Sequence, residues 1–375
     1  MKLIYILPSL GKMGGAERII TEKANYLSRI FGYNISIINL FQDDNTPNMY
    51  PLSNSIRQFN LGIPYHIQYR YKYPKRLFIK LRIEHLLRKR LSQIINSISP
   101  DLLIGVSYSQ GDLVCDIPCK AKKIIECHEP RSLVISNIYH GSFISKLYAK
   151  WIYISTIEKK ADLIVTLTNE DKLQWHKAKR VEFIPNFSSM HITQYSTCKK
   201  KRIIAVGRLN QEKGYDRLIS IWKSVSVKYP DWHLDIYGEG HMKDQLNQLI
   251  ITNNVQNINL RGAASDMSKE YANSSICAVT SYFEGFSLVI LEAMKHGVPC
   301  IAFDCPNGPR NIIIDKENGF LVEDGNYSQY IEKLCTLIEN EQLRQQYSES
   351  SKMRSHDFDI DKIMTQWKNL FEGLL

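Results

Sequence analysis

Two glutamates in the second half of the chain, Glu284 and Glu292, have the residue type and spacing to bind a ligand rich in hydroxyl groups. Seven residues separate them, and Gly285-Phe286-Ser287 follows the first. An ionised carboxylate accepts several hydrogen bonds in fixed directions, which suits sugar hydroxyls. Two glutamates at this spacing, taken alone, more often mark a solvated helix face, so the surrounding elements must decide between the two interpretations.

The sequence around the glutamates predicts a strand, a loop, a helix and a second strand. Cys277–Thr280 is a short β-prone run, residues 286–296 carry apolar side chains at helical spacing, and Gly297 ends the helix. Val298–Phe303 is the next predicted strand. The free N–H groups of Gly285, Phe286, Ser287 and Leu288 then converge at the positive end of the helix dipole, where an anion is expected to bind.

A second stretch, Gly207-Arg208-Leu-Asn-Gln-Glu-Lys213-Gly214, follows the predicted strand Arg202–Val206. An arginine and a lysine on one such loop can converge on a diphosphate, the first as a planar fork and the second as a mobile point charge. Fixed cations there stabilise the charge that grows on a departing diphosphate. The alternative is a pair of ordinary surface charges.

Together these stretches resemble a known family. Glu284 and Glu292 are similar to the E-x7-E motif of retaining GT-B glycosyltransferases of the family-4-like type, and residues 207–214 are similar to that family's G-R-L-x-x-x-K-G. The run Asp304-Cys-Pro-Asn-Gly-Pro-Arg310 resembles the continuation found in bacterial enzymes that build capsules, exopolysaccharide and lipopolysaccharide. The resemblance covers nearly the whole chain and is looser in the first half.

The resemblance implies a role for each of these residues. It assigns Glu284 to the hydroxyls of the donor sugar, Glu292 to the ribose, and Arg208 and Lys213 to the diphosphate. Residues 285–288 would contact sugar and phosphate through their N–H groups. It further implies a nucleotide-sugar donor, most readily a UDP-sugar, a glycan or lipid-linked saccharide acceptor, and no metal or other cofactor.

Five further positions are expected to border the ligand. Gly14 and Gly15 lie between the first strand and first helix, where a backbone can approach a phosphate or sugar. In the family resembled, the loops at Gly238 and Gly262 border the nucleotide, and a histidine at the place of His128 lies near the reacting sugar. His128 follows a β-prone run, although an isolated histidine is often only a core or surface residue.

The order of elements predicts two α/β domains, each a doubly wound parallel sheet, facing each other across a cleft. Strands and helices alternate from Leu3–Leu7 onwards, including a helix expected around residues 143–160. We place the acceptor domain at residues 1–187, a polar linker at 188–201 and the nucleotide-sugar domain at 202–355. The resemblance implies that a C-terminal helix, within residues 356–375, crosses back onto the first domain.

The formal net charge of +10 is concentrated in residues 70–90, where Lys and Arg alternate with apolar and aromatic residues. A basic amphipathic helix of this kind is typical of a surface that docks on an anionic membrane. The alternative is a surface helix whose apolar stripe packs on its own domain. Nucleic acid is a weaker interpretation, because no recognition motif accompanies the basic residues.

Other classes of protein fit less well. Gly238-Glu-Gly240 lacks the third glycine of a dinucleotide fingerprint, which argues against an NAD-dependent enzyme. A non-catalytic nucleotide-sugar-binding protein could lose the charges at positions 208, 213, 284 and 292, and all four are present. Asp357, Asp359 and Asp361 are expected to cap a helix rather than bind a metal. Eight scattered cysteines and no apolar run of membrane-spanning length favour a cytoplasmic protein. The basic segment at residues 70–90 adds the expectation of peripheral binding at the inner face of the membrane.

Overall fold

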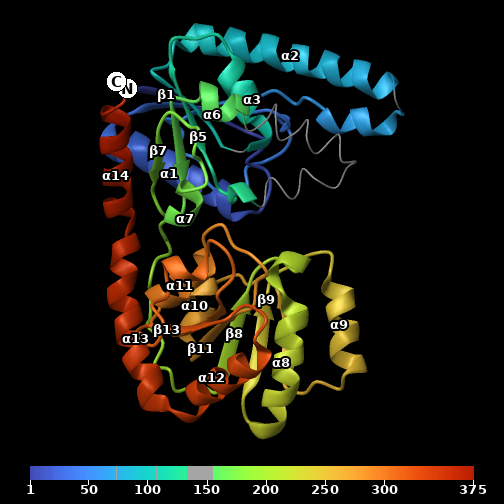
Figure 1. Cartoon of the computed structure of the whole chain (residues 1–375), viewed down its shortest axis with the longest axis vertical. Helices are drawn as coiled ribbons and strands as arrows, with labels where there is room; N and C mark the ends of the chain where they lie inside the picture. Colours follow the sequence, from blue (N-terminus) through green and yellow to red (C-terminus); the bar gives the residue numbers. More distant parts are fainter. Residues whose placement is uncertain (73, 107, 133–154) are drawn as a thin grey trace. The chain divides into compact units, whose positions relative to one another are not determined.

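The computed structural model describes residues 1–72, 74–106, 108–132 and 155–375, and these form two compact units (Figure 1). The first unit contains Met1–Pro185 together with Ile363–Leu375, and the second contains Asn186–Lys362. The helix expected around residues 143–160 lies mostly outside the described residues, and its end is seen as α6 (Ser155–Lys160).

A seven-stranded parallel sheet forms the centre of the first unit, in the order β3-β2-β1-β4-β5-β6-β7. The strand β1 aligns with β2 from Lys2 opposite Asn34 to Leu7 opposite Asn39. The bounds are β1 (Lys2–Leu7), β2 (Asn34–Asn39), β3 (Arg57–Asn60), β4 (Leu102–Gly105), β5 (Lys122–Glu126), β6 (Leu163–Thr166) and β7 (Val181–Phe183).

Helices cover both faces of this first sheet because its strands are apolar on both sides. Ile4 and Ile6 of β1 belong to the core cluster that also holds Leu87 and Leu91. Tyr5 points to the other face, where the Lys23 ammonium lies 5.5 Å from its ring centroid. The helices are α1 (Gly15–Phe31), η1 (Tyr65–Arg70), α2 (Lys75–Ile98), α3 (Tyr108–Asp116), α6, α7 (Asn169–Lys172) and α14 (Ile360–Glu372), the last joining this unit from Ile363 onwards.

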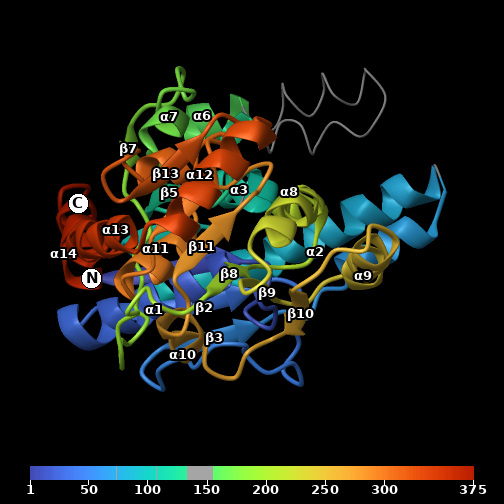
Figure 2. The same cartoon turned by 90° about the horizontal axis from the view of Figure 1, so that it is seen from below.

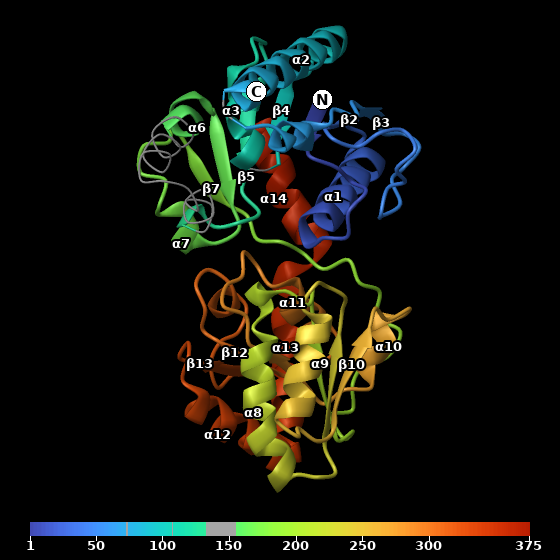
Figure 3. The ribbon, with the colours of Figure 1, turned by 90° about the vertical axis from the view of Figure 1, so that its right-hand side faces the viewer.

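A six-stranded parallel sheet forms the centre of the second unit, in the order β10-β9-β8-β11-β12-β13. Figure 3 shows α8 and α9 together on one face, and Figure 1 shows α10 and α11 on the opposite side of β8 and β9. The strands are β8 (Arg202–Val206), β9 (His233–Tyr237), β10 (Ile258–Gly262), β11 (Ile276–Val279), β12 (Cys300–Phe303) and β13 (Gly319–Val322). The helices are η3 (Gln211–Lys213), α8 (Tyr215–Lys228), α9 (Lys243–Thr252), α10 (Met267–Ala272), α11 (Leu288–Lys295), η4 (Pro309–Asn311), α12 (Tyr327–Glu339), α13 (Glu341–Ser355) and η5 (His356–Phe358).

Both sheets are doubly wound, as the alternating pattern predicts. The chain reverses its direction of travel across the sheet between β1 and β4 in the first unit, and between β8 and β11 in the second. Ligands of open parallel sheets bind outside the carboxyl ends of the strands at such a switch point. The predicted site loops after β1, β8 and β11 all leave the sheets there.

Two details differ from the sequence-based expectations. The central helix, α11, begins at Leu288 rather than at residue 286. Ser287 is extended, and the buried Phe286 packs edge-on against Phe358, with 5.7 Å between the ring centroids.

Residues 188–201 group with the second unit. The Ser196 amide donates to the His296 carbonyl (2.8 Å), and the Arg344 Nε donates to the Cys198 carbonyl (2.9 Å).

Across residues 1–72, 74–106, 108–132 and 155–375, no helix combines the length and the apolar character needed to cross a bilayer.

Candidate active site

Lys213 and Glu284, predicted to act on the same ligand, meet in the second unit. The Lys213 Nζ lies 2.7 Å from the Glu284 Oε1, and the Ser281 Oγ donates to the same oxygen at 2.7 Å. The two side chains are 20% and 9% exposed, so the pair is largely buried. Bonds between ionised partners are about twice as strong as neutral ones. The pair therefore holds a cation and a carboxylate at a fixed point at the edge of the sheet.

The backbone explains why these residues meet. Gly214 has φ +62°, a left-handed conformation that glycine adopts without strain, and a Cβ there would overlap the Thr280 carbonyl. The Thr280 Oγ1 donates to the Gly214 carbonyl at 2.9 Å. The loop after β8 is thereby joined to the end of β11, and Lys213 is brought to Glu284.

A row of glycines continues the same edge of the sheet. The Gly207 amide donates to the Tyr237 carbonyl, and the Gly238 amide donates to the Gly262 carbonyl, each at 2.9 Å. A Cβ on Gly238 (φ +141°) would overlap the Gly207 carbonyl. The loops after β8, β9 and β10 therefore pack backbone against backbone, with no room for a side chain at Gly238.

The start of α11 has the free donors that an anion needs. Among the described residues, no hydrogen bond is recorded from the amides of Gly285, Phe286, Ser287 or Leu288. Ser287 precedes the helix without a side-chain cap, and its buried Oγ has no hydrogen-bond partner within the described chain. Unsatisfied N–H groups and the helix dipole favour negative charge at this point.

Glu292 lies inside α11 and is held by residues that belong to none of the sequence motifs. Its Oε2 accepts a hydrogen bond from the Tyr271 hydroxyl at 3.1 Å, and the Tyr271 ring stacks on His296, with 5.3 Å between centroids. The His296 Nε2 lies 2.8 Å from the Ser268 Oγ, and its Nδ1 lies 2.7 Å from the Glu292 carbonyl oxygen. Glu292 is only 6% exposed. Burial lowers the pKa of His296, which favours the neutral ring.

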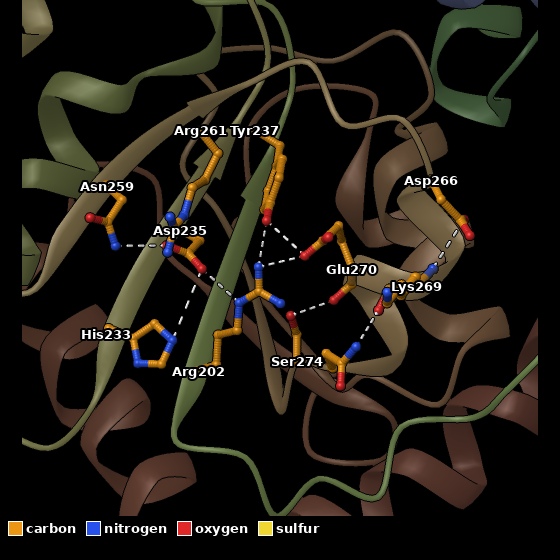
Figure 4. Close-up of polar contacts among 11 residues, drawn as sticks. Arg202, His233, Asp235, Tyr237, Asn259, Arg261, Asp266, Lys269, Glu270 and Ser274 are labelled. Atoms are coloured by element: carbon orange, nitrogen blue, oxygen red, sulfur yellow. Dashed lines mark hydrogen bonds and ion pairs between the residues drawn. The ribbon is translucent and has the colours of Figure 1, made fainter.

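Figure 4 shows a polar network that joins α10 to the strands behind these loops. The Arg202 Nε donates to the Asp235 Oδ2 and its Nη2 donates to the Glu270 Oε2, each at 2.7 Å. The Tyr237 hydroxyl also donates to the Glu270 Oε2 (2.7 Å), and the Arg261 Nε donates to the Asp235 Oδ1 (2.8 Å). Because Tyr237 and Arg261 directly precede Gly238 and Gly262, the network fixes the bases of both glycine loops.

Arg208, the second predicted diphosphate ligand, lies apart from the Lys213–Glu284 pair. Its side chain is 64% exposed, and its ion pair is with Glu212, at 3.9 Å. A loose contact between exposed groups costs little to break. Arg208 therefore has the freedom to turn towards a bound anion.

Two buried polar groups beside the pair stay protonated. Burial raises the pKa of the Cys305 thiol, and the neighbouring Glu284 carboxylate raises it further. Burial and Glu284 act in the same way on the pKa of the Tyr215 hydroxyl. A thiol and a phenol add no charge, so the charges at this point are those of Lys213 and Glu284.

In the first unit, His128 follows β5, at the carboxyl edge of the sheet. Its side chain is 10% exposed, and its Nε2 lies 3.5 Å from the Glu126 Oε2. Gly14 and Gly15 begin α1 at the same edge, and a Cβ on Gly14 would overlap the Glu17 carboxylate. The Tyr50 hydroxyl donates to the Gly14 carbonyl at 3.3 Å.

The comparisons with known proteins point to one chemistry. Residues 194–354 match the model of the glycosyl transferases group 1 family. An uncharacterized glycosyltransferase of Haemophilus influenzae is 28% identical, covering 98% of this chain and 99% of its own. The amylovoran biosynthesis glycosyltransferase AmsD of Erwinia amylovora is 25% identical over the same shares. The solved structure of Anabaena HepE in complex with UDP and glucose has a TM-score of 0.74 and 18% identity, with full coverage of both chains.

This chain is a GT-B glycosyltransferase. The family match includes Arg208, Lys213, Glu284 and Glu292, and the structural likeness extends over both units.

The acidic run near the C-terminus of the glycosyltransferase is engaged with basic residues. Asp357 pairs with Arg354 at 2.8 Å, and Asp359 pairs with His356 at 2.9 Å. These contacts join consecutive turns between α13 and α14, where carboxylates are favourable at a helix start.

Asp171 anchors the segment that follows His128, and sequence reasoning did not single it out. Its Oδ1 accepts from the Arg131 amide at 2.8 Å, and it is 3% exposed. Burial raises the pKa of Asp171 from its ordinary 3.8 to about 6, although the bonds from Arg131 and Trp175 act in the opposite direction.

Asp171→Asn is therefore expected to gain stability relative to the wild type as the pH rises from 5 to 7. The folded wild type must release the raised-pKa proton in that range, and the unfolded chain has already released it below pH 5. The expected change in the difference of unfolding free energy is on the order of 1–2 kcal/mol, measured by denaturant titration at both pH values. Asp231→Asn, at an exposed carboxylate whose pKa is lowered by Lys201, should show no such trend. A difference that stays flat or falls with pH for Asp171→Asn would contradict the assignment.

Proposed function

We propose that this glycosyltransferase moves a hexosyl or N-acetylhexosaminyl group from a UDP-sugar to a glycan or lipid-linked saccharide, with retention of the anomeric configuration and without a metal. The acceptor belongs to surface polysaccharide assembly. The observation that carries the proposal is the Lys213–Glu284 pair beside the free amides of 285–288. The similarity to the amylovoran biosynthesis glycosyltransferase AmsD and to HepE, solved in complex with UDP and glucose, supports it.

In this proposal the diphosphate binds between Lys213 and the start of α11. The Lys213 ammonium and the amides of 285–288 stabilise the charge that develops as the bond from the anomeric carbon to the phosphate oxygen breaks. Arg208 turns from Glu212 to complete the site. A preorganised cation and helix terminus supply the neutralisation that a divalent metal provides in other nucleotide-sugar enzymes.

Glu284 binds the hydroxyls of the donor sugar, and Glu292 binds the ribose. In the chain without ligand, Glu284 already accepts from Lys213 and Ser281, so its orientation is set before the sugar arrives. The loops at Gly207, Gly238 and Gly262 give the nucleotide a surface of main-chain groups.

The transfer step needs no separate general base. The acceptor hydroxyl attacks the anomeric carbon from the face that the diphosphate leaves; one C–O bond forms as the other breaks. The hydroxyl proton passes to the departing phosphate oxygen. His128 hydrogen-bonds the donor sugar, or its carbonyl stabilises the positive character that develops at the anomeric carbon.

The direct test incubates the protein with a panel of UDP-sugars and with saccharide or lipid-linked acceptors in the presence of EDTA. NMR then follows the turnover of each donor. The proposal predicts release of UDP from one donor and a product with the donor's anomeric configuration. Thermal stabilisation by NAD but not by UDP or GDP would overturn it, since a ligand of the folded state raises Tm by mass action.

Tyr271→Phe tests the assignment of Glu292. Removal of one hydroxyl takes away a hydrogen bond to the Glu292 Oε2 without changing the shape of the core. The KM for the UDP-sugar is expected to rise about 5- to 10-fold with kcat little changed, because a contact made equally in ground and transition states is weakened. The matched control is Tyr330→Phe, a buried tyrosine whose hydroxyl donates to the Ile301 carbonyl at 3.0 Å. Equal KM changes in the two variants would contradict the role of Tyr271.

We also propose that α2 docks on an anionic membrane. Its first two turns expose Leu77 (44%), Phe78 (70%) and Leu81 (54%), and these lie among Lys75, Arg76, Lys80 and Arg82. Further along, Leu87 and Leu91 are buried in the core of the first unit, so the most exposed part of the stripe lies at the N-terminal end of α2. Figures 1 and 2 show α2 and η1 reaching past the edge of the sheet. Each basic residue near such a surface contributes about 1 kcal/mol.

Sedimentation with vesicles tests this second proposal. The protein should bind vesicles of phosphatidylglycerol and not those of phosphatidylcholine. Phe78→Ser with Leu81→Ser should weaken binding by about 10-fold or more, since two apolar anchors are lost. The control pair is Val227→Ser with Ile251→Ser, at residues 81% and 78% exposed in the second unit. Equal loss in both pairs, or binding to neutral vesicles alone, would contradict the proposal.

A further inference from the structure

A buried ion pair lies beside His128 and has no role in the function described so far. Lys23 of α1 pairs with Glu126, the last residue of β5, and the two side chains are 1% and 3% exposed. Burial lowers the pKa of Lys23, while Glu126 opposes that shift. For Glu126, burial alone would raise the pKa, but Lys23 and His128 more than offset it. The carboxylate form of Glu126 is thus favoured next to Lys23.

The cation is enclosed by aromatic rings. The Lys23 Nζ lies 3.8 Å from the centroid of the Trp367 ring and 5.5 Å from that of Tyr5. Trp367 comes from α14 and is 4% exposed, and Tyr5 comes from β1 and is fully buried. Ring faces attract a desolvated ammonium group. Segments far apart in the sequence, including the C-terminal helix, therefore meet around a single charge.

A buried ion pair of this kind usually adds little to the stability of the fold. The cost of removing two charges from water commonly equals their attraction, and replacement by apolar or neutral groups of similar volume is often neutral or stabilising. The pair does, however, lie next to His128. The Glu126 Oε2 that accepts from Lys23 is also 3.5 Å from the His128 Nε2.

Several polar atoms beside the ion pair are buried without a hydrogen bond. Within the described residues, the Glu126 Oε1 and both ring nitrogens of His128 are buried and have no hydrogen-bond partner. Glu126 is thus the carboxylate against which the ring is placed. If it lost Lys23, it would be free to turn or to take up a proton, and the ring would lose its fixed neighbour.

We propose that Lys23, Glu126 and Trp367 are positioning residues for His128, holding its ring in the orientation that the transfer step uses. This inference rests on the proposed function, in which His128 faces the reacting sugar. It also gives the C-terminal helix a part in the reaction. Trp367 of this helix acts by holding the Lys23–Glu126 pair and does not contact the ligand.

The test removes both charges together with the double substitution Lys23→Met and Glu126→Gln, which keeps the volumes nearly constant. The expected result is a fall in kcat of about 10- to 100-fold, with the KM of the donor changed less than about threefold, since misplacement of a reacting group acts on the chemical step. The Tm should stay within a few degrees of the wild type. A matched control is Tyr33→Phe, which removes a hydrogen bond to Glu372 of α14 (3.0 Å) and should leave kcat unchanged.

A double-mutant cycle with His128→Ala separates positioning from general loosening. In the His128→Ala background, the same double substitution should leave kcat unaltered, because the residue through which the pair acts is gone. If the double variant unfolds, Trp367→Leu replaces it in the same cycle. Multiplicative losses of kcat, or full activity of the double variant or of His128→Ala, would overturn the inference. A wild type that turns over no nucleotide sugar would instead overturn the proposed function.

Discussion

Lys213→Ala is expected to lower kcat/KM for the UDP-sugar by about 100-fold or more, close to 3 kcal/mol of transition-state stabilisation. The Lys213 Nζ lies 2.7 Å from the Glu284 Oε1. Its removal takes away a charge that is fixed before the diphosphate departs. Steady-state kinetics at saturating acceptor, with UDP release as the readout, measures the effect.

Lys228→Ala is the matched control for this substitution. Lys228 pairs with Glu339 at 2.8 Å, but both side chains are more than half exposed, and exposed pairs contribute little. Its kcat/KM should stay within about twofold of the wild type. Loss of less than about threefold in Lys213→Ala would mean that the leaving group is stabilised elsewhere.

Gly308→Ala is expected to lower kcat/KM by about 10- to 100-fold without touching a charged group. A Cβ at this position would overlap the Glu284 Cβ and lie 3.2 Å from its Cγ, so Glu284 would have to move. A displacement of about 1 Å at a binding carboxylate is enough for a loss of this size. The unfolding free energy should fall by about 1–3 kcal/mol, as for other overpacked sites.

Gly325→Ala provides the contrast to Gly308→Ala. Gly325 has φ +82° and nothing within 4 Å of an added Cβ, so the substitution strains the backbone but displaces no neighbour. It should cost about 1 kcal/mol of stability and leave kcat/KM unaltered. Equal activity of the two variants would show that Glu284 tolerates displacement.

Most of the sheet could be predicted because its strands are apolar on both faces. The runs that became β1, β6, β8 and β12 read directly as buried strands, as parallel sheets covered on both sides require. The edge strand β3, Arg57-Gln-Phe-Asn60, was missed because its residues are only partly buried and carry no periodic apolar signal. α10 was missed because six residues are too few for a helical pattern.

The helix α10, which the sequence did not predict, supplies residues that hold the site. α10 supplies Tyr271, which donates to Glu292, and Glu270, which closes the Arg202 network. Asp266, whose side chain accepts from the Lys269 amide, was the one sequence signal for its start.

The charged residues of the site were found by motif, and their partners were not. Spacing alone places Lys213 and Glu284 on two loops. Contacts between residues far apart in the sequence, such as the Gly214–Thr280 hydrogen bond, bring those loops together. Pairs such as Lys23–Glu126 are separated by 103 positions, and no local pattern relates them. The start of α11 also moved from residue 286 to Leu288, since the packing of Phe286 on Phe358 outweighs helix propensity.

A crystal structure of the protein with bound UDP is the most direct test of the central claim, that Lys213 and the start of α11 hold the diphosphate. We predict phosphate oxygens within hydrogen-bond distance of the Lys213 Nζ and of the amides of 285–288, with the ribose on Glu292. UDP bound elsewhere, with Lys213 still engaged only by Glu284 and the α11 amides free of ligand, would contradict the account.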